Sequence, residues 1–385
     1  MAADLKVAVV GAGWMGHVHA RAYARLAQHY PGLGTAVSLV AVADSAPAQT
    51  ADFTARFPGT QAYHDWREML QDDSIDAVSV TAPNFLHREI GVAVAQAGKH
   101  LWIEKPVGLT AADAQAVAAA VAQAGVVCAT GFNYRNFPAV ARARQAITSG
   151  EIGRITHARV WLLTDYAAHP GGPLSWRYTL EKGGHGVLGD LASHGADMAR
   201  YLLGDIERLV AVTDTFIPQR PLAQAGVSHY AVGSADGPTG PVENEDYVVA
   251  LARLASGVPL TLESSRAAVG DQNNYGFEVH GTQGLVRWDF RRSDELSLSV
   301  GDEYSNQPTS TVFAGPGDGD YGHFQPGAGI AIGYDDSKVM ECAAFLRGIA
   351  AGSVQGAGID DAVASAKVLE AIVTSASSGS WVAVG

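Results

Sequence analysis

Two side chains that can move a proton stand four residues apart in the segment GVLGDLASHGADMARYLLG. They are Asp190 and His194, and apolar residues recur around them at helical spacing. Residues four apart share one face of a helix, so the carboxylate can fix the tautomer of the imidazole and raise its basicity. This arrangement favours a general base that acts on a hydroxyl group. The alternative is an ordinary exposed ion pair on a helix, which is the more common origin of this spacing.

A lysine at the end of an apolar run is a third candidate for proton transfer. Lys105 stands in the stretch HLWIEKP and directly precedes Pro106. Because proline lacks a backbone N–H, the predicted strand ends here and presents the lysine at the carboxyl edge of the sheet, where parallel sheets bind ligands. A surface lysine in a loop is the alternative interpretation.

Three glycines follow the first apolar run of the chain. Gly11, Gly13 and Gly16 stand in VAVVGAGWMGHVHA, between a strand pattern at 7–10 and a helix pattern at 14–29. In such a turn the glycines permit a tight bend, a close approach to a pyrophosphate and close packing of helix on strand. The helix N-terminus adds free N–H groups for the phosphates. The sequence therefore predicts a dinucleotide site, and a glycine-rich turn of another α/β fold is the alternative.

Asp44 ends the second predicted strand, where a carboxylate can accept both ribose hydroxyls of NAD. It lies further from the glycines than the usual ~20 residues, because the segment HYPGLGTAV is inserted before the strand. A 2′-phosphate would be repelled by this carboxylate, and the next residues are Ser45 and Ala46 rather than an arginine. The expected cofactor is therefore NAD rather than NADP.

The elements that position these residues alternate in the first third of the chain. Strand patterns at 7–10, at 38–44 and in DAVSVTAP, HLWIEKP and VVCATGF alternate with helix patterns, among them 46–57 and 87–97. This order is typical of a doubly wound parallel sheet. The sequence predicts an N-terminal Rossmann NAD-binding domain.

The pattern of the chain changes after Asn133. One helix pattern at 138–149 is followed by long runs in which polar and apolar residues alternate, as in an antiparallel sheet with one covered face. Two further helix patterns, at 337–351 and 360–377, end the chain. The predicted fold class is α/β, with a Rossmann domain at 1–132 and an α+β substrate-binding and oligomerisation domain at 133–385, built on a large, mainly antiparallel open sheet.

Composition limits the classes of function. A chain of 385 residues, 47% hydrophobic and 17% charged, is expected to form about two well-buried domains. Its net charge of −13 argues against nucleic acid and anionic membranes as partners, because phosphates need a surplus of Lys and Arg. Cys128 and Cys342 lie in apolar stretches and are expected to be buried thiols. The stretch MAADLKVAVV has no basic segment followed by an apolar region, so it is not expected to act as a secretion signal. A cytoplasmic protein without a metal is expected.

Taken in order, the glycine turn, E-K-P at 104–106 and D-x-x-x-H at 190–194 resemble the Gfo/Idh/MocA oxidoreductase family, which includes glucose–fructose oxidoreductase and inositol dehydrogenase. The likeness covers nearly the whole chain. It includes TAPNFLH at 81–87, GFNYR at 131–135, GEIG at 150–153, SWR at 175–177 and the late segment GYDDSKVMECAAFLRGIAAG.

The resemblance implies roles for individual residues. Lys105, Asp190 and His194 would form the catalytic set, with His194 removing the hydroxyl proton and Lys105 polarising or relaying it. Pro106 would flank the same crevice. The implied contacts to NAD are Gly11, Gly13, Trp14, Met15, Gly16, Asp44, Ser45, Thr81, Ala82, Asn84, His87, Glu104, Lys105, Asn133, Trp176 and Arg177. The implied contacts to substrate are Tyr134, Lys182, His185, Asp190, His194 and Tyr334, and further candidates for sugar contacts are Arg135, Tyr166, His169, Asn273 and His323.

The family's usual substrates are sugars and cyclitols, and the segments around SWR and HFQPGAGIAIGYDD look most like the branch that oxidises a ring C3 hydroxyl, the levoglucosan-type dehydrogenases. A dehydrogenase with net NADH production is the first expectation. A glycoside hydrolase that uses NAD transiently is the alternative, in which Lys182 and Arg177 would bind an anionic head such as a sulfonate. A non-enzymatic NAD-responsive regulator is disfavoured by the complete catalytic set. A homodimer or homotetramer is expected, formed by face-to-face packing of the open sheets.

Overall fold

A computed structural model describes residues 3–222 and 237–385, which form two compact units. Unit 1 is built from the described residues of Met1–Asn136 together with Ile332–Ala364, and unit 2 from those of Phe137–Ala331 with Ser365–Gly385. The first boundary lies close to the expected division after residue 132. The expectation of a second domain that runs unbroken from 133 to 385 differs from the structure, since Ile332–Ala364 belongs to unit 1.

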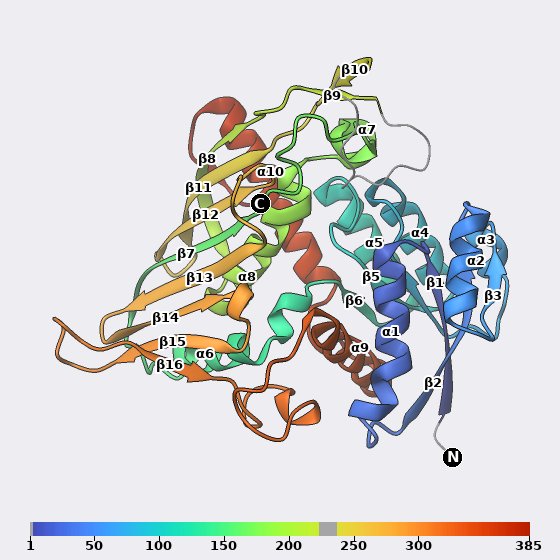
Figure 1. Cartoon of the computed structure of the whole chain (residues 1–385), viewed down its shortest axis with the longest axis horizontal. Helices are drawn as coiled ribbons and strands as arrows, with labels where there is room; N and C mark the ends of the chain where they lie inside the picture. Colours follow the sequence, from blue (N-terminus) through green and yellow to red (C-terminus); the bar gives the residue numbers. More distant parts are fainter. Residues whose placement is uncertain (1–2, 223–236) are drawn as a thin grey trace. The chain divides into compact units, whose positions relative to one another are not determined.

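This late segment belongs to unit 1 because of the helix it contains. Helix α9 (Tyr334–Ala351) packs along α1 (Trp14–His29), and Figure 1 shows the two helices side by side. Arg21 pairs with Asp335 and Arg25 with Asp336 at the start of α9. Most of α9 is buried, so its apolar residues contribute to the core of unit 1.

Unit 1 contains a six-stranded parallel sheet with the strand order β3-β2-β1-β4-β5-β6. Residues 7–10 of β1 and the whole of β4 are buried, as expected for parallel strands that are covered on both faces. The strand order reverses between β1 and β4, and the turn after β1 therefore lies at the switch point where such sheets bind ligands. The strands are β1 (Ala3–Val10), β2 (Thr35–Ala43), β3 (Gln61–Tyr63), β4 (Ala77–Val80), β5 (His100–Ile103) and β6 (Cys128–Thr130). The other helices are α2 (Pro47–Arg56), α3 (Trp66–Met69), α4 (Asn84–Gln96) and α5 (Ala111–Ala124).

Unit 2 contains a nine-stranded sheet with the order β16-β15-β14-β13-β7-β12-β11-β8-β17. All its pairs are antiparallel except β7 with β12. The strands are β7 (Ile155–Leu163), β8 (Ile206–Asp214), β11 (Tyr247–Leu254), β12 (Pro259–Ser265), β13 (Asn274–Gly281), β14 (Gly284–Asp289), β15 (Glu295–Val300), β16 (Ser310–Phe313) and β17 (Val382–Ala383), and β9 (Gln219–Pro221) pairs separately with β10 (Thr239–Pro241).

Helices cover one face of the large sheet. Helix α6 (Pro138–Thr148) packs on β14 and β15, and α8 (Ser193–Leu203) packs on β7 and β12. Along β11 buried and accessible residues alternate, as expected for a sheet with one covered face. A short helix α7 (Leu180–Gly183) precedes α8, and α10 (Ile359–Ser378) begins in unit 1 and continues into unit 2. The predicted fold class is confirmed.

The two cysteines and the helices can be compared with what the composition predicts. Cys128 in β6 and Cys342 in α9 are buried free thiols, as predicted. Within the described part of the chain, no helix combines the length and the apolar character needed to cross a membrane.

Candidate functional site: a dinucleotide turn and candidate acid–base residues

The turn between β1 and α1 requires glycine at two positions. Gly11 has φ +95°, and a Cβ there would lie 2.8 Å from the backbone of Thr81 and Ala82. A Cβ at Gly16 would lie 2.1 Å from the carbonyl oxygen of Gly11. At Gly13, by contrast, a Cβ would meet nothing within 4 Å. Gly11 and Gly16 are therefore fixed by packing, whereas Gly13 leaves open space for a ligand to approach the backbone.

The N-terminus of α1 has the free donors that a pyrophosphate needs. Its N-cap residue is Gly13, which has no side chain to cap the helix, and no acidic residue lies in the first turn. The first backbone N–H groups of the helix therefore lack the usual side-chain acceptor and carry the positive end of the helix dipole. This arrangement fits the phosphates of NAD.

Asp44 directly follows β2 and connects two loops of the same edge. One carboxylate oxygen accepts a hydrogen bond of 2.8 Å from the backbone N–H of Ala12, and the other accepts one of 2.9 Å from that of Ala46. Each carboxylate oxygen has a second lone pair for a ribose hydroxyl. The carboxylate is therefore held in place beside the glycine turn.

Thr81 and His87 hold the neighbouring loops of unit 1 together. The Thr81 hydroxyl donates to the carbonyl oxygens of Val10 and Gly11, at 3.0 and 2.7 Å. The buried His87 ring lies 2.6 Å from the Ala82 carbonyl oxygen and 2.7 Å from that of Pro106. Burial lowers the pKa of His87, and these two carbonyls oppose the shift. His87 thus connects the loops that follow β4 and β5.

Lys105 lies two residues after the end of β5, close to the predicted strand end, and is half-buried. The preceding residue continues the sheet, because the Glu104 backbone N–H donates to the Val80 carbonyl oxygen at 2.9 Å. The side chain of Glu104 is buried and pairs with His19 and Lys338. The carboxylate of Glu104 therefore lies inside unit 1, next in sequence to the candidate catalytic lysine.

The described residues include one group with the composition of a metal site. Its members are His19, Glu104 and Glu341, whose ligand atoms lie within 4.8 Å of one another. However, the Lys338 ammonium lies 2.5 Å from an oxygen of Glu104 and 3.0 Å from one of Glu341. This ammonium already places a positive charge in contact with both carboxyl groups.

An aromatic group lies beside the glycine turn in unit 1. Trp14, which is 64% exposed, stacks on Tyr334 with ring centroids 5.6 Å apart. The Tyr334 ring also lies 6.3 Å from that of Tyr134, and its hydroxyl lies 3.9 Å from the sulfur of Met15. Burial raises the pKa of Tyr334 well above its ordinary value. Unit 1 thus brings together Tyr134 and Tyr334, two candidate substrate contacts, and Trp14 and Met15, two candidate cofactor contacts.

Asp190 of unit 2 has two partners in its own unit. It lies in a turn of π-helix, Leu188–Ala192, which leads into α8. The Tyr166 hydroxyl donates to one carboxylate oxygen at 2.5 Å, and the Arg177 guanidinium lies 3.7 Å from the other. Burial and the neighbouring Asp190 raise the pKa of Tyr166 well above its ordinary value, so this hydroxyl keeps its proton and remains a donor. Both partners orient the carboxylate of Asp190.

His194 follows in the first turn of α8 and is buried. Its carbonyl oxygen accepts a hydrogen bond of 2.9 Å from the Tyr275 hydroxyl, and the two rings have centroids 6.4 Å apart. The preceding residue, Ser193, accepts a hydrogen bond of 3.1 Å at its carbonyl oxygen from the Ser365 hydroxyl. These contacts fix the backbone at the start of α8.

The other residues predicted in unit 2 lie in several segments of the chain, some of them close to Asp190 in sequence. Arg177 lies over the Trp176 ring at 4.6 Å, and the Asn244 amide donates at 2.9 Å to the carbonyl oxygens of Arg177 and Gly184. Lys182, in α7, is exposed, whereas His185 is half-buried. Asn273 has φ +46°, His169 lies in an exposed loop, and His323 is the exposed last residue of a short 3₁₀-helix, Tyr321–His323.

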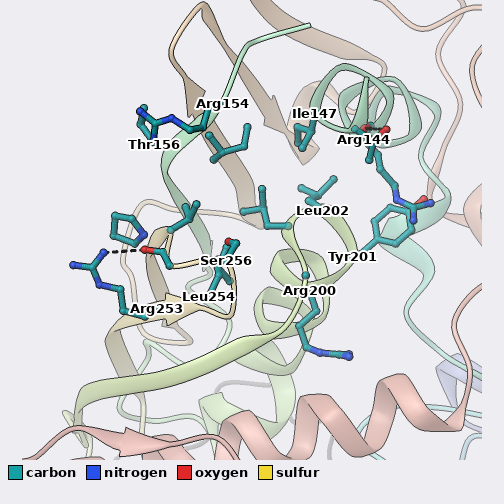
Figure 2. A pocket seen from close by; sticks show the side chains of 17 residues that line it. Arg144, Ile147, Arg154, Thr156, Arg200, Tyr201, Leu202, Arg253, Leu254 and Ser256 are labelled. Atoms are coloured by element: carbon teal, nitrogen blue, oxygen red, sulfur yellow. Dashed lines mark hydrogen bonds between the residues drawn. The ribbon is translucent and has the colours of Figure 1, made fainter. Parts of the chain in front are cut away.

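A separate hollow of about 910 Å³ lies at the other end of α8 (Figure 2). It is lined by the ends of α6 and α8, the start of β7 and the β11–β12 turn, and includes four arginines, Arg144, Arg154, Arg200 and Arg253. Arg200 pairs with Asp205, Arg253 donates to the Gly257 carbonyl oxygen, and Arg144 lies over the Tyr201 ring. None of the predicted site residues lines this hollow.

Sequence reasoning missed two sets of contacts. Tyr166 is a candidate sugar contact in the sequence, but its hydroxyl bonds to Asp190, 24 residues away. The group around Lys338 was not predicted at all. The available signal was a lysine and a glutamate, Lys338 and Glu341, three residues apart on the predicted helix that begins at 337. Buried charges of this kind are usually paired.

Comparison with protein-family models matches residues 5–132 to the oxidoreductase family, NAD-binding Rossmann fold, and residues 140–287 to the GFO/IDH/MocA C-terminal domain. The chain belongs to the GFO/IDH/MocA oxidoreductase family. The resemblance inferred from the sequence motifs is confirmed, and NAD is the cofactor of its Rossmann domain. The first matched segment lies in unit 1 and the second in unit 2.

Individual members of the family resemble the chain over nearly its whole length. Levoglucosan dehydrogenase of Pseudarthrobacter phenanthrenivorans is 38% identical over 385 residues, covering 99% of this chain and 98% of that protein. A solved structure of levoglucosan dehydrogenase in complex with NADH and levoglucosan is 36% identical, with a TM-score of 0.92 and 99% of both chains covered. Inositol 2-dehydrogenase of Rhizobium meliloti is 28% identical over 80% of this chain and 83% of its own length.

Proposed function

We propose that this protein is an NAD-dependent dehydrogenase that oxidises a ring hydroxyl of a sugar, cyclitol or glycoside, with C3 as the position attacked. The observation that carries the proposal is the likeness to levoglucosan dehydrogenase, which extends over both units. The candidate acid–base residues are all present, as Lys105 in unit 1 and as Asp190 and His194 in unit 2.

In the proposed reaction His194 takes the proton from the substrate hydroxyl. Asp190 supports the positive charge that develops on the imidazole, and Tyr166 and Arg177 keep this carboxylate oriented. Lys105 donates a hydrogen bond to the reacting oxygen or relays its proton. NAD⁺, when bound, would supply the hydride acceptor for the carbon that carries the hydroxyl.

Most of the proposed cofactor contacts belong to unit 1. The free N–H groups at the start of α1 bind the pyrophosphate, and Gly13 lets the phosphates reach them. The carboxylate of Asp44 accepts hydrogen bonds from the ribose hydroxyls. The remaining contacts implied by the family resemblance, including Asn84, Asn133 and Trp176, are part of this proposal.

The proposal extends to the assembly and the compartment. Two free buried thiols suit a reducing cytoplasm. The face of the large sheet that α6 and α8 leave uncovered is proposed to pack against the same face of a second copy.

A panel of substrates tests the function directly. Purified protein is given NAD⁺ with levoglucosan, myo-inositol, glucose and an aryl glucoside, and NADH and free phenol are followed in parallel. Steady NADH production from an unmodified sugar supports the dehydrogenase, and a deuterium isotope effect with C3-labelled substrate supports the position. Phenol release without net NADH would instead establish the NAD-dependent glycosidase. Binding of NAD⁺ with neither product would contradict both enzyme functions.

A further inference from the structure

A buried lysine in α9 contacts the residue next to the candidate catalytic lysine. Lys338 is fully buried, and its ammonium donates to the Glu104 carboxylate at 2.5 Å. Glu104 comes directly before Lys105 at the end of β5. Because Lys338 and Glu104 are 234 residues apart in the chain, this contact connects the late segment of unit 1 to the strand end that carries Lys105.

The Glu104 carboxylate is held from several sides. His19 approaches the same oxygen at 3.0 Å, and the His19 ring stacks on Trp102 with centroids 3.7 Å apart. A Cβ at Gly131 would lie 2.5 Å from the carboxylate, so the space is available only because that residue is glycine. Burial opposes ionisation of Glu104, but the charge of Lys338 and the bond from His19 outweigh it and hold its pKa below the ordinary value.

Lys338 is itself fixed within α9. It donates to Glu341 at 3.0 Å, and the same Glu341 oxygen accepts a hydrogen bond of 2.6 Å from the Trp102 indole. Trp102 belongs to β5, so both Glu341 and Lys338 connect α9 to this strand. The start of α9 is anchored on α1 by the pair of Arg21 with Asp335. The ammonium is therefore part of a rigid group that spans a helix and a strand.

We propose that Lys338 is a positioning residue for Lys105, acting through the carboxylate of Glu104. The inference rests on the proposed function, in which Lys105 acts on the reacting oxygen. The ammonium of Lys338 fixes the side chain of Glu104, and with it the backbone from which Lys105 extends. A shift of an acid–base group by about 1 Å can cost on the order of 100-fold in rate.

The chain offers a matched control at the opposite end of the same strand. Lys99 directly precedes β5, is buried, and donates to the carbonyl oxygens of Asp72 and Ile75 at 2.8 and 2.9 Å. Lys338→Met and Lys99→Met therefore each remove one buried ammonium next to β5. Only the first removes an ammonium that contacts the neighbour of Lys105.

Two measurements on the full-length variants test the proposal. With Lys338→Met, kcat is expected to fall about tenfold or more while KM and the Kd for NAD⁺ stay within about threefold. The rate at which an amine-reactive ester labels Lys105, followed by peptide mass spectrometry across pH, is expected to change as well. Lys99→Met is expected to alter the melting temperature without changing either measurement.

The double variant Lys338→Met/Glu104→Gln separates positioning from stability. It leaves no unpaired carboxylate at Glu104, so it is expected to melt at a higher temperature than Lys338→Met but to keep a low kcat. Wild-type kcat in the double variant would overturn the proposal, as would equal effects of Lys338→Met and Lys99→Met on kcat and labelling. The labelling rate does not depend on a sugar. If Lys338→Met changes the labelling rate of Lys105 but the wild-type protein oxidises no sugar, the proposed function is rejected and the positioning role is retained. If Lys338→Met leaves the labelling rate unchanged, the positioning role is rejected.

Discussion

The carboxylate of Asp44 accepts a hydrogen bond of 2.8 Å from the backbone N–H of Ala12, which lies between the first two glycines of the dinucleotide turn. The residue that follows β2 is therefore fixed by the turn that follows β1. The second carboxylate oxygen of Asp44 accepts a hydrogen bond from the backbone N–H of Ala46. The carboxylate therefore cannot turn away from the ribose site without losing two hydrogen bonds.

This geometry predicts a preference for NAD over NADP. Burying a 2′-phosphate beside a fixed carboxylate is expected to weaken binding by about 1.4 kcal/mol or more, a factor of at least about ten. Titration of both cofactors by tryptophan fluorescence measures the ratio, and Asp44→Ser is expected to reduce it. Asp73→Ser, which alters an exposed loop of the same unit, is the control. Equal affinities in the wild type would contradict the role of Asp44.

Replacement of His194 tests the proposed general base. With His194→Ala, kcat is expected to fall by ~10²–10⁴, because that is the usual contribution of acid–base catalysis. NAD⁺ affinity is expected to change little, since the glycine turn that binds the pyrophosphate belongs to unit 1. His157→Ala, an exposed histidine on β7, is the control. Near-normal turnover of His194→Ala would reject this assignment.

The contact between Tyr166 and Asp190 predicts a smaller effect. Tyr166→Phe removes a hydrogen bond to a carboxylate, and such bonds contribute about 1.5–3 kcal/mol. A fall of about tenfold or more in kcat is expected if that bond orients Asp190 during the reaction. Tyr247→Phe is the matched control, because its hydroxyl donates to Glu263 at 3.0 Å elsewhere in unit 2. If both variants turn over at the wild-type rate, Tyr166 has no part in catalysis.

The sequence predicts those features that depend on neighbouring residues. Gly11 and Gly16 are required by the backbone of one local turn, and the alternating apolar pattern of β11 follows from its one covered face. Both features depend on residues that lie close together in the sequence, so the glycine turn and the strand pattern can be recognised before the fold is known.

Contacts between distant residues could not be predicted in this way. The Glu104 partner Lys338 lies 234 residues away, and a lysine in a helix pattern does not reveal which carboxylate it will meet. The return of Ile332–Ala364 to unit 1 has the same origin, because the apolar pattern of α9 shows that it is buried but not against which helix. Such partners are determined by topology.

The uncovered face of the large sheet predicts association of two copies. Leu251 lies opposite Val210 and Val249 opposite Val212 across β11 and β8. Leu251 and Val212 are 55% and 63% exposed in the single chain. Leu251→Lys is expected to shift the sedimentation coefficient toward the monomer at micromolar concentration, because it places a charge in an apolar contact. Val354→Lys, at an exposed position in unit 1, is the control. A wild-type protein that sediments only as a monomer would contradict the prediction.

Two buried groups beside Lys338 predict opposite effects of pH on stability. Burial lowers the pKa of His19 from 6.5 to about 4, although the bond to Glu104 opposes the shift. Between these values the unfolded chain binds a proton that the folded chain does not, so His19 makes the protein less stable as pH falls from 6.5 to 4.

Glu341 acts in the other direction over an overlapping range. Burial raises its pKa from 4.5 to about 7, although Lys338 opposes the shift. The folded chain then holds a proton that the unfolded chain has lost, so Glu341 makes the protein less stable as pH rises from 4.5 to 7. Removing each group should therefore change the pH dependence of the melting temperature with opposite sign.

The measurement is the difference between the melting temperatures at pH 7 and pH 5, compared among three proteins. His19→Gln is expected to reduce this difference relative to the wild type, because it removes the group that destabilises the fold in acid. Glu341→Gln is expected to increase it, because it removes the group that destabilises the fold near neutrality. His64→Gln, at an exposed position, is expected to leave it unchanged. A change of the same sign in both buried variants would show that loss of packing, rather than the ionisation of His19 and Glu341, determines the result.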